Sequence, residues 1–384
     1  MVPSGNEDRR RRRAVAAQRS EVSVKRRLMF YTTSLSGGGA ERVWAVLASE
    51  LAHRGHDVTL VVDFAAEENR AFLAPEVKVE VVGSRQLRSI VALKALIERV
   101  RPDLVLTALG GCDIKALLAT LPFGGRRIVM SYHGYYTGEG GLLTKALVRL
   151  AALWTRMTAA TVCVSDDLRH YLIRRWHARA DRLERIYNPI VVEGVPSSLD
   201  AATLAGREPL VLAVGRLVEV KDYTFLVRAF ARMRDRSAKL AILGQGEQHD
   251  AIEAEARRLG VADRVVLPGY VDLPWAWYAR ARCFALTSRF ESFGNVVVEA
   301  LAHGLPVVTT PCGGPIEIVS DPRFGEVVPF DDEEAWARAL DTALAAPGDP
   351  TPRMRRAADF GVAAITDRYE ALIERVLARV GPAH

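Results

Sequence analysis

The fold of this chain is decided by one stretch, Ser288-Arg-Phe-Glu-Ser-Phe-Gly-Asn-Val-Val-Val-Glu-Ala-Leu-Ala-His-Gly-Leu-Pro-Val-Val308. Its pattern predicts a loop, followed by a helix from about Asn295 to His303. Gly304 is predicted to end that helix, and the apolar residues 305–310 to form a buried strand. A loop, a helix and a buried strand in this order are typical of α/β proteins built on parallel sheets.

Two glutamates flank the start of this predicted helix. Glu291 precedes the helix and Glu299 lies inside it. The first N–H groups of a helix lack partners and lie at the positive end of its dipole, so they can bind phosphate. Carboxylates repel phosphate but accept hydrogen bonds from sugar hydroxyls. We therefore predict a site for a ligand that carries both a phosphate and a sugar.

The charge of the chain is concentrated at its N-terminus. Of the 384 residues, 52 are basic and 46 acidic, a formal net charge of +6. Residues 1–27 hold nine basic and three acidic residues, so the remainder is neutral. A nucleic-acid-binding protein would carry its excess charge on the folded surface, so we expect no nucleic-acid partner. Runs of like charge usually stay unfolded, which makes 1–27 a predicted disordered basic tail.

The apolar runs and the cysteines indicate in which cellular compartment the protein is expected. No apolar run has the length needed to cross a bilayer, and the tail lacks the apolar core of a signal peptide. Cys112, Cys163, Cys283 and Cys312 are widely spaced and form no metal-binding pairs. We therefore expect reduced thiols in a cytoplasmic protein.

A basic amphipathic segment over 142–157 leaves a membrane role open. At 100° per residue, Lys145, Arg149 and Arg156 share one side, and apolar residues cover the other. Such a helix can lie in the interface of an anionic membrane, and the basic tail could add to this attraction. An ordinary surface helix packed on a sheet would show the same pattern. The protein is therefore placed in the cytoplasm, with peripheral attachment to the inner face of the plasma membrane as an alternative.

Strands and helices alternate along the whole chain. Strands are predicted at 28–33, 57–62, 103–107, 127–131, 160–164 and 184–187, and again at 210–214, 240–243, 265–267, 283–286 and 307–309. The turn-rich segment 189–208 separates the two series, which predicts two doubly wound Rossmann-like domains over 28–190 and 191–363. Ligands of such sheets bind at the carboxyl ends of the strands, so we expect a cleft there. The chain ends in predicted helices near 332–346 and 353–380.

Three further features lie at predicted carboxyl ends of strands. Gly37-Gly38-Gly39 follows the first strand and allows a ligand close to the backbone, although a flexible turn would look the same. Arg216 and Lys221 follow the strand at 210–214 and could bind a diphosphate, although surface ion pairs are equally compatible. His133 follows the strand at 127–131, where a structural histidine is also possible.

These motifs together resemble glycosyltransferase family 4, whose members have the GT-B fold. The resemblance covers about 28–375, and Glu291 and Glu299 within Phe290-Glu-Ser-Phe-Gly-Asn-Val-Val-Val-Glu-Ala are its most specific part. Gly215-Arg216-Leu217 with Lys221, the Gly37-Gly38-Gly39-Ala-Glu41 loop and Cys312-Gly313-Gly314-Pro315-Ile-Glu317 also match. Asp222 departs from the pattern, because many members have glycine after the lysine.

The resemblance implies a role for each residue. Arg216 and Lys221 would hold the donor diphosphate, with Gly38 and Gly39 and the N–H groups of Asn295 and Val296 contacting the same phosphates. Glu299 would accept hydrogen bonds from the ribose and Glu291 from the donor sugar. His133 would line the sugar and acceptor side, and Val271 would lie near the base. Phe293 and Gly294 complete the implied donor-binding set. The last helix, 364–384, would pack back on the first domain.

The implied reaction is the transfer of a hexose or N-acetylhexosamine from a nucleotide-diphosphate sugar, with a UDP-sugar as the first candidate. The family retains the anomeric configuration, and the two cations take the place of a metal, so neither metal nor cofactor is expected. The acceptor would be a glycan or a lipid-linked glycan of the cell envelope. Two alternatives stay open: an epimerase or phosphorylase of the same fold, and a non-catalytic nucleotide-sugar-binding protein.

Overall fold

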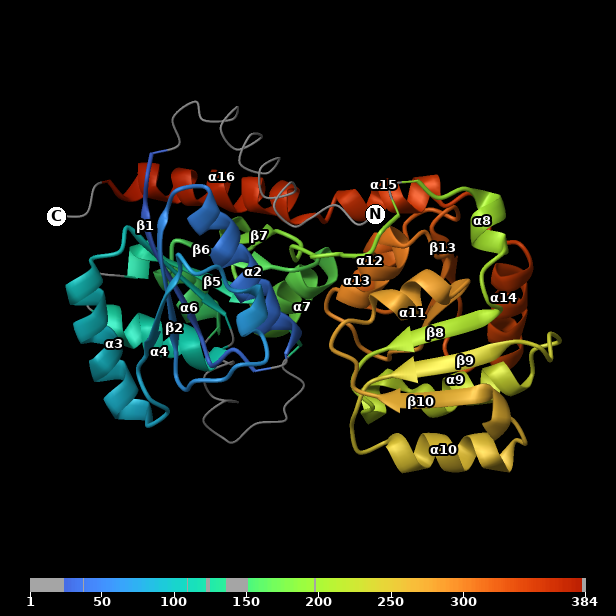
Figure 1. Ribbon diagram of the computed structural model, residues 1–384. Helices are drawn as coiled ribbons and strands as arrows, with labels where there is room; N and C mark the ends of the chain where they lie inside the picture. Colours follow the sequence, from blue (N-terminus) through green and yellow to red (C-terminus); the bar gives the residue numbers. More distant parts are fainter. Residues whose placement is uncertain are drawn as a thin grey trace. The chain divides into compact units, whose positions relative to one another are not determined.

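The protein is described by a computed structural model that contains two β-sheets flanked by helices (Figure 1). The structure describes residues 24–36, 38–108, 110–121, 125–135, 151–196 and 198–381. Most of the predicted basic tail, 1–27, and most of the basic segment 142–157 lie outside these residues. None of the helices in the described ranges is long and apolar enough to cross a membrane.

The first sheet has seven strands in the order β3-β2-β1-β4-β5-β6-β7. Its strands are β1 (Arg27–Thr32), β2 (Asp57–Val62), β3 (Lys78–Val81), β4 (Leu104–Ala108), β5 (Ile128–Tyr132), β6 (Ala160–Cys163) and β7 (Leu183–Arg185). Its helices are α2 (Gly39–His53), α3 (Gln86–Val100), α4 (Gly110–Thr120), α6 (Ala151–Met157) and α7 (Asp166–Trp176), and short 3₁₀ turns occur at Arg70–Phe72, Gly125–Arg127 and Ala180–Arg182. Strand β1 runs parallel to β2 and β4, so Phe30 lies between Leu60 and Leu106 in the centre of the sheet.

The second sheet has six strands in the order β10-β9-β8-β11-β12-β13. Its strands are β8 (Leu210–Val214), β9 (Lys239–Leu243), β10 (Val265–Gly269), β11 (Cys283–Leu286), β12 (Val307–Thr309) and β13 (Gly325–Val327). Its helices are α8 (Ala201–Ala205), α9 (Tyr223–Ala231), α10 (His249–Arg258), α11 (Trp275–Arg280), α12 (Asn295–Ala302), α13 (Gly313–Ile318), α14 (Glu333–Ala345) and α15 (Thr351–Ala358), with 3₁₀ turns at Glu219–Lys221 and Ala262–Arg264. The last helix, α16 (Val362–Val380), follows them in the chain. All neighbouring strands of the second sheet are parallel.

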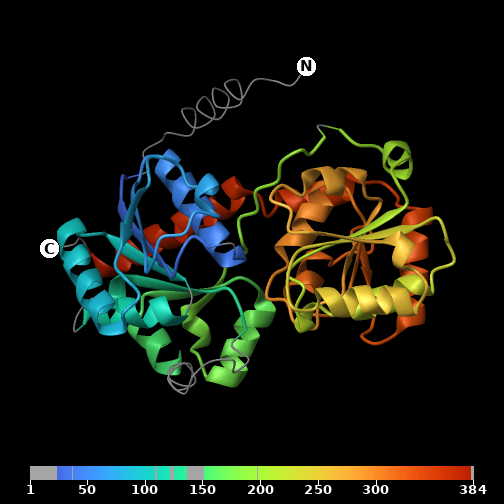
Figure 2. The same cartoon turned by 60° about the horizontal axis from the view of Figure 1, so that its bottom comes forward.

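Both sheets place the first strand of their series next to the fourth, which is the doubly wound order of Rossmann-like folds. The strands are short apolar runs because both faces of each sheet are covered by helices. Helices α9, α10 and α14 form one hydrophobic core with the second sheet, whereas α11 and α12 contact its strands separately (Figures 1 and 2). The predicted α/β fold with two Rossmann-like domains is therefore confirmed.

The described chain also divides into two compact units. One contains the described residues of 1–130, 157–159 and 372–384, and the other those of 131–156 and 160–371. The boundary between the two units differs from the boundary between the two sheets, because the first sheet ends with β7 and the second begins with β8. The predicted domain limits at 190 and 363 stay a prediction. In the first unit, the end of α16 is held by Arg26, whose Nε donates to Glu374 at 2.9 Å, and by Arg127, which donates to the carbonyl of Gly381 at 2.8 Å.

The prediction of one long helix over 353–380 is wrong. Helix α15 ends at Ala358 and α16 begins at Val362. Between them, the carbonyl of Phe360 accepts a hydrogen bond from the backbone of Ile190 at 2.9 Å, and Ile190 bridges to Gly361. Phe360 and Gly361 thus pair with Ile190 in the manner of a short β-bridge, and this pairing lies at the break between α15 and α16.

Candidate functional site

Helix α12 begins as the sequence predicts. It starts at Asn295, and Gly294 precedes it with φ of +94°, a conformation that side chains rarely adopt. The preceding loop is held by α13, because the backbone N–H of Gly314 donates to the carbonyl of Glu291 at 3.0 Å. A Cβ atom on Gly314 would lie 2.3 Å from the Cα of Phe293, so glycine is required for this close approach. The start of α12 is thus fixed from two sides.

The side chains of Lys221 and Glu291 form an ion pair, with Nζ donating to Oε2. Both side chains are largely buried, with exposed fractions of 15% and 20%. Their loops are joined by two further bonds, from Thr287 Oγ1 to the carbonyl of Lys221 and from the backbone N–H of Arg289 to the carbonyl of Val220, both 2.8 Å. The structure therefore brings together the predicted diphosphate-binding cation and the predicted sugar-binding carboxylate.

Arg216 lies at the end of β8 on the same side of the second sheet. Its side chain is exposed and has no hydrogen bond or ion pair with the described residues. The backbone around it is tightly packed, because a Cβ on Gly244 would lie 1.9 Å from the carbonyl oxygen of Gly215. Arg216 thus extends from a rigid turn with its guanidinium available to an anion.

Glu299 is buried on α12, with 5% of its surface exposed. Its Oε2 accepts a hydrogen bond from the hydroxyl of Tyr278 at 2.8 Å. Tyr278 stacks on His303 with ring centres 5.1 Å apart, and His303 stacks in turn on Trp275 at 5.9 Å. The Glu299 carboxylate is therefore held by a tyrosine that belongs to an aromatic stack, and its predicted role at the ribose stays a prediction.

His133 follows β5 and connects to the start of α12 through Asn188. Its Nε2 lies 3.0 Å from the hydroxyl of Ser131. Burial lowers the pKa of His133 to about 4, although a hydrogen bond with Asn188 acts in the opposite direction. The amide of Asn188 also donates to Oδ1 of Asn295 at 2.9 Å. His133 is therefore a neutral imidazole at pH 7, linked through one amide to the first residue of α12.

Comparison with known proteins gives the family. The family model described as Glycosyltransferase Family 4 matches residues 37–193, and the model described as Glycosyl transferases group 1 matches residues 208–346. These two matches cover both predicted domains, and the second contains Arg216, Lys221, Glu291 and Glu299. The chain belongs to glycosyltransferase family 4. This confirms the family that the sequence motifs resemble.

Individual relatives support the same assignment. A Campylobacter jejuni protein, N-acetylgalactosamine-N,N'-diacetylbacillosaminyl-diphospho-undecaprenol 4-alpha-N-acetylgalactosaminyltransferase, is 33% identical over 174 residues, 45% of this chain and 47% of its own length. The lipopolysaccharide core biosynthesis glycosyltransferase LpsE of Rhizobium meliloti is 27% identical over 348 residues, 88% of this chain and 96% of its own. The structure of Anabaena HepE in complex with UDP matches with a TM-score of 0.78 at 20% identity, covering 91% and 100% of the two chains, and confirms the GT-B fold.

The roles of all predicted site residues stay predictions, those of Gly38, Gly39 and Val271 included. Gly38 precedes α2 and Gly39 opens it, and a Cβ on Gly38 would lie 2.0 Å from the carboxylate of Glu41. They belong to the other compact unit, and Gly37 lies outside the described residues. Val271 is half-buried, next to Tyr270, whose ring is 59% exposed. None of these observations tests contact with a nucleotide.

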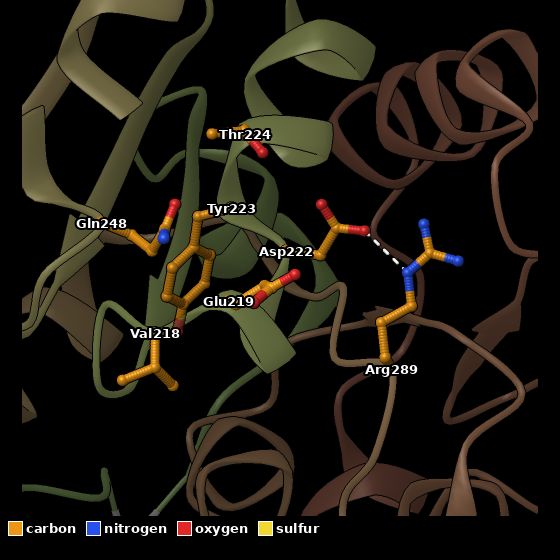
Figure 3. Close-up of a pocket in the computed structure, with 7 residues that line it drawn as sticks. All are labelled: Val218, Glu219, Asp222, Tyr223, Thr224, Gln248 and Arg289. Carbon is orange, nitrogen blue, oxygen red and sulfur yellow. Dashed lines mark hydrogen bonds and ion pairs between the residues drawn. The ribbon is translucent and has the colours of Figure 1, made fainter. Parts of the chain in front are cut away.

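Asp222 explains the departure of this glycosyltransferase from the family pattern. Its φ is +50°, the left-handed conformation for which glycine is usually chosen, and aspartate is one of the few residues that tolerate it. Its carboxylate accepts a hydrogen bond from Arg289 Nε at 2.8 Å. Figure 3 shows this pair beside a pocket of about 490 Å³ that Tyr223 and Gln248 also line. The aspartate thus keeps the loop shape and adds an ion pair.

The sequence predicts no role for Glu317, and in the structure this residue stabilises the start of α7. Its two carboxylate oxygens accept the backbone N–H groups of Asp166 and Asp167 at 3.1 and 2.9 Å, and the hydroxyl of Tyr187 donates to it at 3.1 Å. These N–H groups open α7, where a negative charge is favourable. The only signal in the sequence was its place in the family's glycine-rich loop, which gave no indication of the partner helix.

A possible metal site is confined to α10. Among the described residues, His249, Asp250 and Glu253 are the only such group whose ligand atoms lie close enough to share an ion. They lie at the surface and none is a predicted site residue. Metal-independent transfer therefore stays a prediction.

Proposed function

We propose that this glycosyltransferase transfers a hexose or N-acetylhexosamine from a nucleotide-diphosphate sugar, with a UDP-sugar as the first candidate, to a glycan or lipid-linked acceptor in cell-envelope polysaccharide biosynthesis. The observation that carries the proposal is the Lys221–Glu291 pair at the start of α12. It sets a phosphate-binding cation beside a carboxylate that can bind sugar hydroxyls. The similarity to LpsE and to the Campylobacter relative supports the envelope acceptor, and the similarity to HepE, whose structure contains UDP, supports the donor.

The proposed chemistry assigns the cations to the leaving group. Arg216 and Lys221 bind the diphosphate and neutralise the charge that grows on it as the sugar leaves. The N–H groups of Asn295 and Val296 at the start of α12 donate to the same phosphates. Two cations and a helix terminus together can stabilise a leaving diphosphate without a metal ion. The nucleotide's ribose is held by Glu299.

The proposed transfer retains the anomeric configuration, as the family resemblance implies. Glu291 accepts hydrogen bonds from the donor sugar and orients it, and no second carboxylate of the motif acts as a nucleophile. The acceptor hydroxyl attacks from the side of the leaving phosphate, whose oxygen takes the hydroxyl's proton. The new glycosidic bond then forms on the face from which the diphosphate departs. The neutral His133 lines the sugar and acceptor side.

The Lys221–Glu291 pair has a direct consequence for donor binding. A diphosphate competes with Glu291 for the ammonium of Lys221, and it carries more charge than one carboxylate. Once Lys221 turns to the phosphates, Glu291 is released for the sugar. The same exchange thus binds the leaving group and prepares the sugar-binding carboxylate.

Transfer is tested by Glu291→Ala. We expect acceptor-dependent release of nucleoside diphosphate to be abolished while the circular dichroism spectrum and melting temperature stay near those of the original protein. Glu334→Ala is the matched control, because Glu334 is 73% exposed and forms only a 3.9 Å contact with Arg338. Full transfer by Glu291→Ala would refute the assignment. Product formation from orthophosphate would indicate a phosphorylase, and donor binding without turnover over an acceptor panel would indicate a non-catalytic protein.

The proposed acceptor also suggests contact with an anionic membrane through 142–157 and the basic tail. Of the three cations, only Arg156 lies in a described helix, α6, where it is exposed. Replacing Lys145, Arg149 and Arg156 together by glutamine should reduce co-sedimentation with vesicles that contain phosphatidylglycerol at low salt. Neutral phosphatidylcholine vesicles serve as the control. Unchanged binding to the anionic vesicles would leave only a packing role for this helix.

A further inference from the structure

Tyr223 is a buried tyrosine whose hydroxyl has no hydrogen-bond partner among the described residues. It is the first residue of α9, and 3% of its surface is exposed. A buried hydroxyl without a partner costs free energy, so native proteins rarely retain one without a use for it. No role in binding or transfer has been assigned above to Tyr223.

The hydroxyl of Tyr223 lies among the residues proposed to bind the diphosphate. A Cβ on Gly215 would lie 2.7 Å from Tyr223 Oη and 3.6 Å from Cε of Lys221, so the hydroxyl and the lysine stem meet beside the bare Cα of Gly215. Burial raises the pKa of Tyr223, and the carboxylate of Glu291 raises it further. The phenol is therefore neutral and can donate a hydrogen bond to a carboxylate.

The neighbouring Asp222 is excluded as the partner of this hydroxyl. Figure 3 shows the two side chains directed apart, with the Asp222 carboxylate turned toward Arg289. The carboxylate that raises the pKa of Tyr223 is that of Glu291, whose Oε2 is bonded to Lys221. The hydroxyl thus lies beside the stem of the lysine whose ammonium is bonded to Glu291.

We propose that Tyr223 is a positioning residue for Glu291: when a nucleoside diphosphate draws Lys221 away, the Tyr223 hydroxyl donates to the released carboxylate. This inference rests on the proposed function, because it requires a diphosphate that competes for Lys221. The exchange gives each group one partner in the nucleotide complex. Lys221 binds phosphate, the phenol replaces Lys221 as a donor to Glu291, and the remaining lone pairs of Glu291 face the sugar. Without the phenol, release of Glu291 would leave its partly buried carboxylate with only the long hydrogen bond that Ser288 Oγ donates to Oε2 at 3.4 Å.

The test is Tyr223→Phe, with UDP affinity measured by calorimetry and stability by thermal unfolding without nucleotide. The melting temperature should stay equal or rise, because phenylalanine removes an unpaired buried hydroxyl and keeps the ring. The affinity for UDP should fall by about tenfold, the effect of one hydrogen bond to a charged group. Tyr31→Phe is the control: the Tyr31 hydroxyl donates to Asp63 at 2.6 Å, so this change should lower the melting temperature and leave UDP affinity unchanged.

A double-mutant cycle with Glu291→Ala separates this role from a direct contact with phosphate. If the hydroxyl acts through Glu291, Tyr223→Phe should not change UDP affinity in the Glu291→Ala background. A tenfold loss that persists there would overturn the proposal, and so would a Tyr223→Phe protein that binds UDP as tightly as the original. If the original protein binds none of UDP, GDP and ADP, the proposed function itself fails and this inference with it. That failure is visible before any Tyr223 variant is measured.

Discussion

The carboxylate of Asp222 accepts a hydrogen bond from Arg289 across 67 residues of sequence, while Asp222 itself has φ of +50°. Arg289 is also bonded to Asp331 at 2.9 Å, so one guanidinium connects the two carboxylates. These contacts raise the pKa of Arg289, with Asp331 as the larger cause. Arg289 lies two residues before Glu291. The ion pair therefore joins the two loops that carry the predicted diphosphate-binding and sugar-binding groups.

The first prediction separates two effects of Asp222 on stability, that of its backbone conformation and that of its carboxylate charge. Asp222→Gly removes the ion pair but relieves the left-handed conformation, so its free energy of unfolding should stay within about 0.5 kcal/mol of the original. Asp222→Ala removes the pair and keeps a Cβ in that conformation, so it should be less stable than Asp222→Gly by about 1 kcal/mol. Urea denaturation of the three proteins measures this order. Equal stability of the glycine and alanine variants would show that the conformation carries no cost.

The second prediction concerns competition for Lys221. Glu291→Gln removes the negative charge that holds the ammonium, so the protein should bind UDP several-fold more tightly although it loses transfer. Lys221→Ala removes the cation, so UDP affinity should fall by about tenfold or more. Calorimetric titration with UDP at fixed ionic strength measures both. A Glu291→Gln protein that binds UDP more weakly would mean that Glu291 does not compete for Lys221.

The third prediction concerns the cap that Glu317 provides to α7. Glu317→Ala leaves the first N–H groups of α7 and the Tyr187 hydroxyl without their acceptor, so the protein should lose about 2 kcal/mol of stability. The exposed Glu334 is again the control, and its replacement by alanine should change stability by less than about 0.5 kcal/mol. Chemical denaturation measures both values. If the two variants lose the same amount, the cap is not a significant source of stability.

The fourth prediction uses the pKa of His133. This pKa is lowered to about 4, below its ordinary value of 6.5, so the unfolded chain binds up to one more proton between these limits. The contribution of His133 to stability is therefore complete above pH 6.5 and is lost as the pH falls toward 4, at no more than about 1.4 kcal/mol per pH unit. Stability curves of the original protein and His133→Asn should diverge in this window. Parallel curves would contradict the lowered pKa.

The local structure of the site could be predicted because its signals are local. Asn295, Gly304 and the apolar run after it predict α12 and β12, and the alternation of short apolar strands with amphipathic helices predicts the doubly wound sheets. The edge strand β3 is absent from the prediction because its residues, Lys78–Val81, are exposed or half-buried and show no apolar pattern. A pattern of apolar residues cannot identify a strand whose side chains are only partly buried.

The contacts between distant residues could not be predicted. Lys221 and Glu291 are 70 residues apart, and each had a separate expected role. Their pairing depends on how the loops after β8 and β11 meet, which no periodicity encodes. The unpaired hydroxyl of Tyr223 could not be predicted either, because tyrosine and phenylalanine fit the same apolar helix position and the sequence does not show where the hydroxyl lies. The pairing of Ile190 with the break between α15 and α16 is likewise a contact between distant residues.

The contrast between the exposed Arg216 and the paired Lys221 has a kinetic consequence. A charge without a counterion projects its field into solvent, whereas the field of a paired charge is largely cancelled. Arg216 should therefore capture the incoming anion and set an association rate that depends on ionic strength. Lys221 becomes available only after it exchanges partners, so it should govern how long the nucleotide stays bound. Arg216 would then set the association rate constant of the nucleotide, and Lys221 would set its dissociation rate constant.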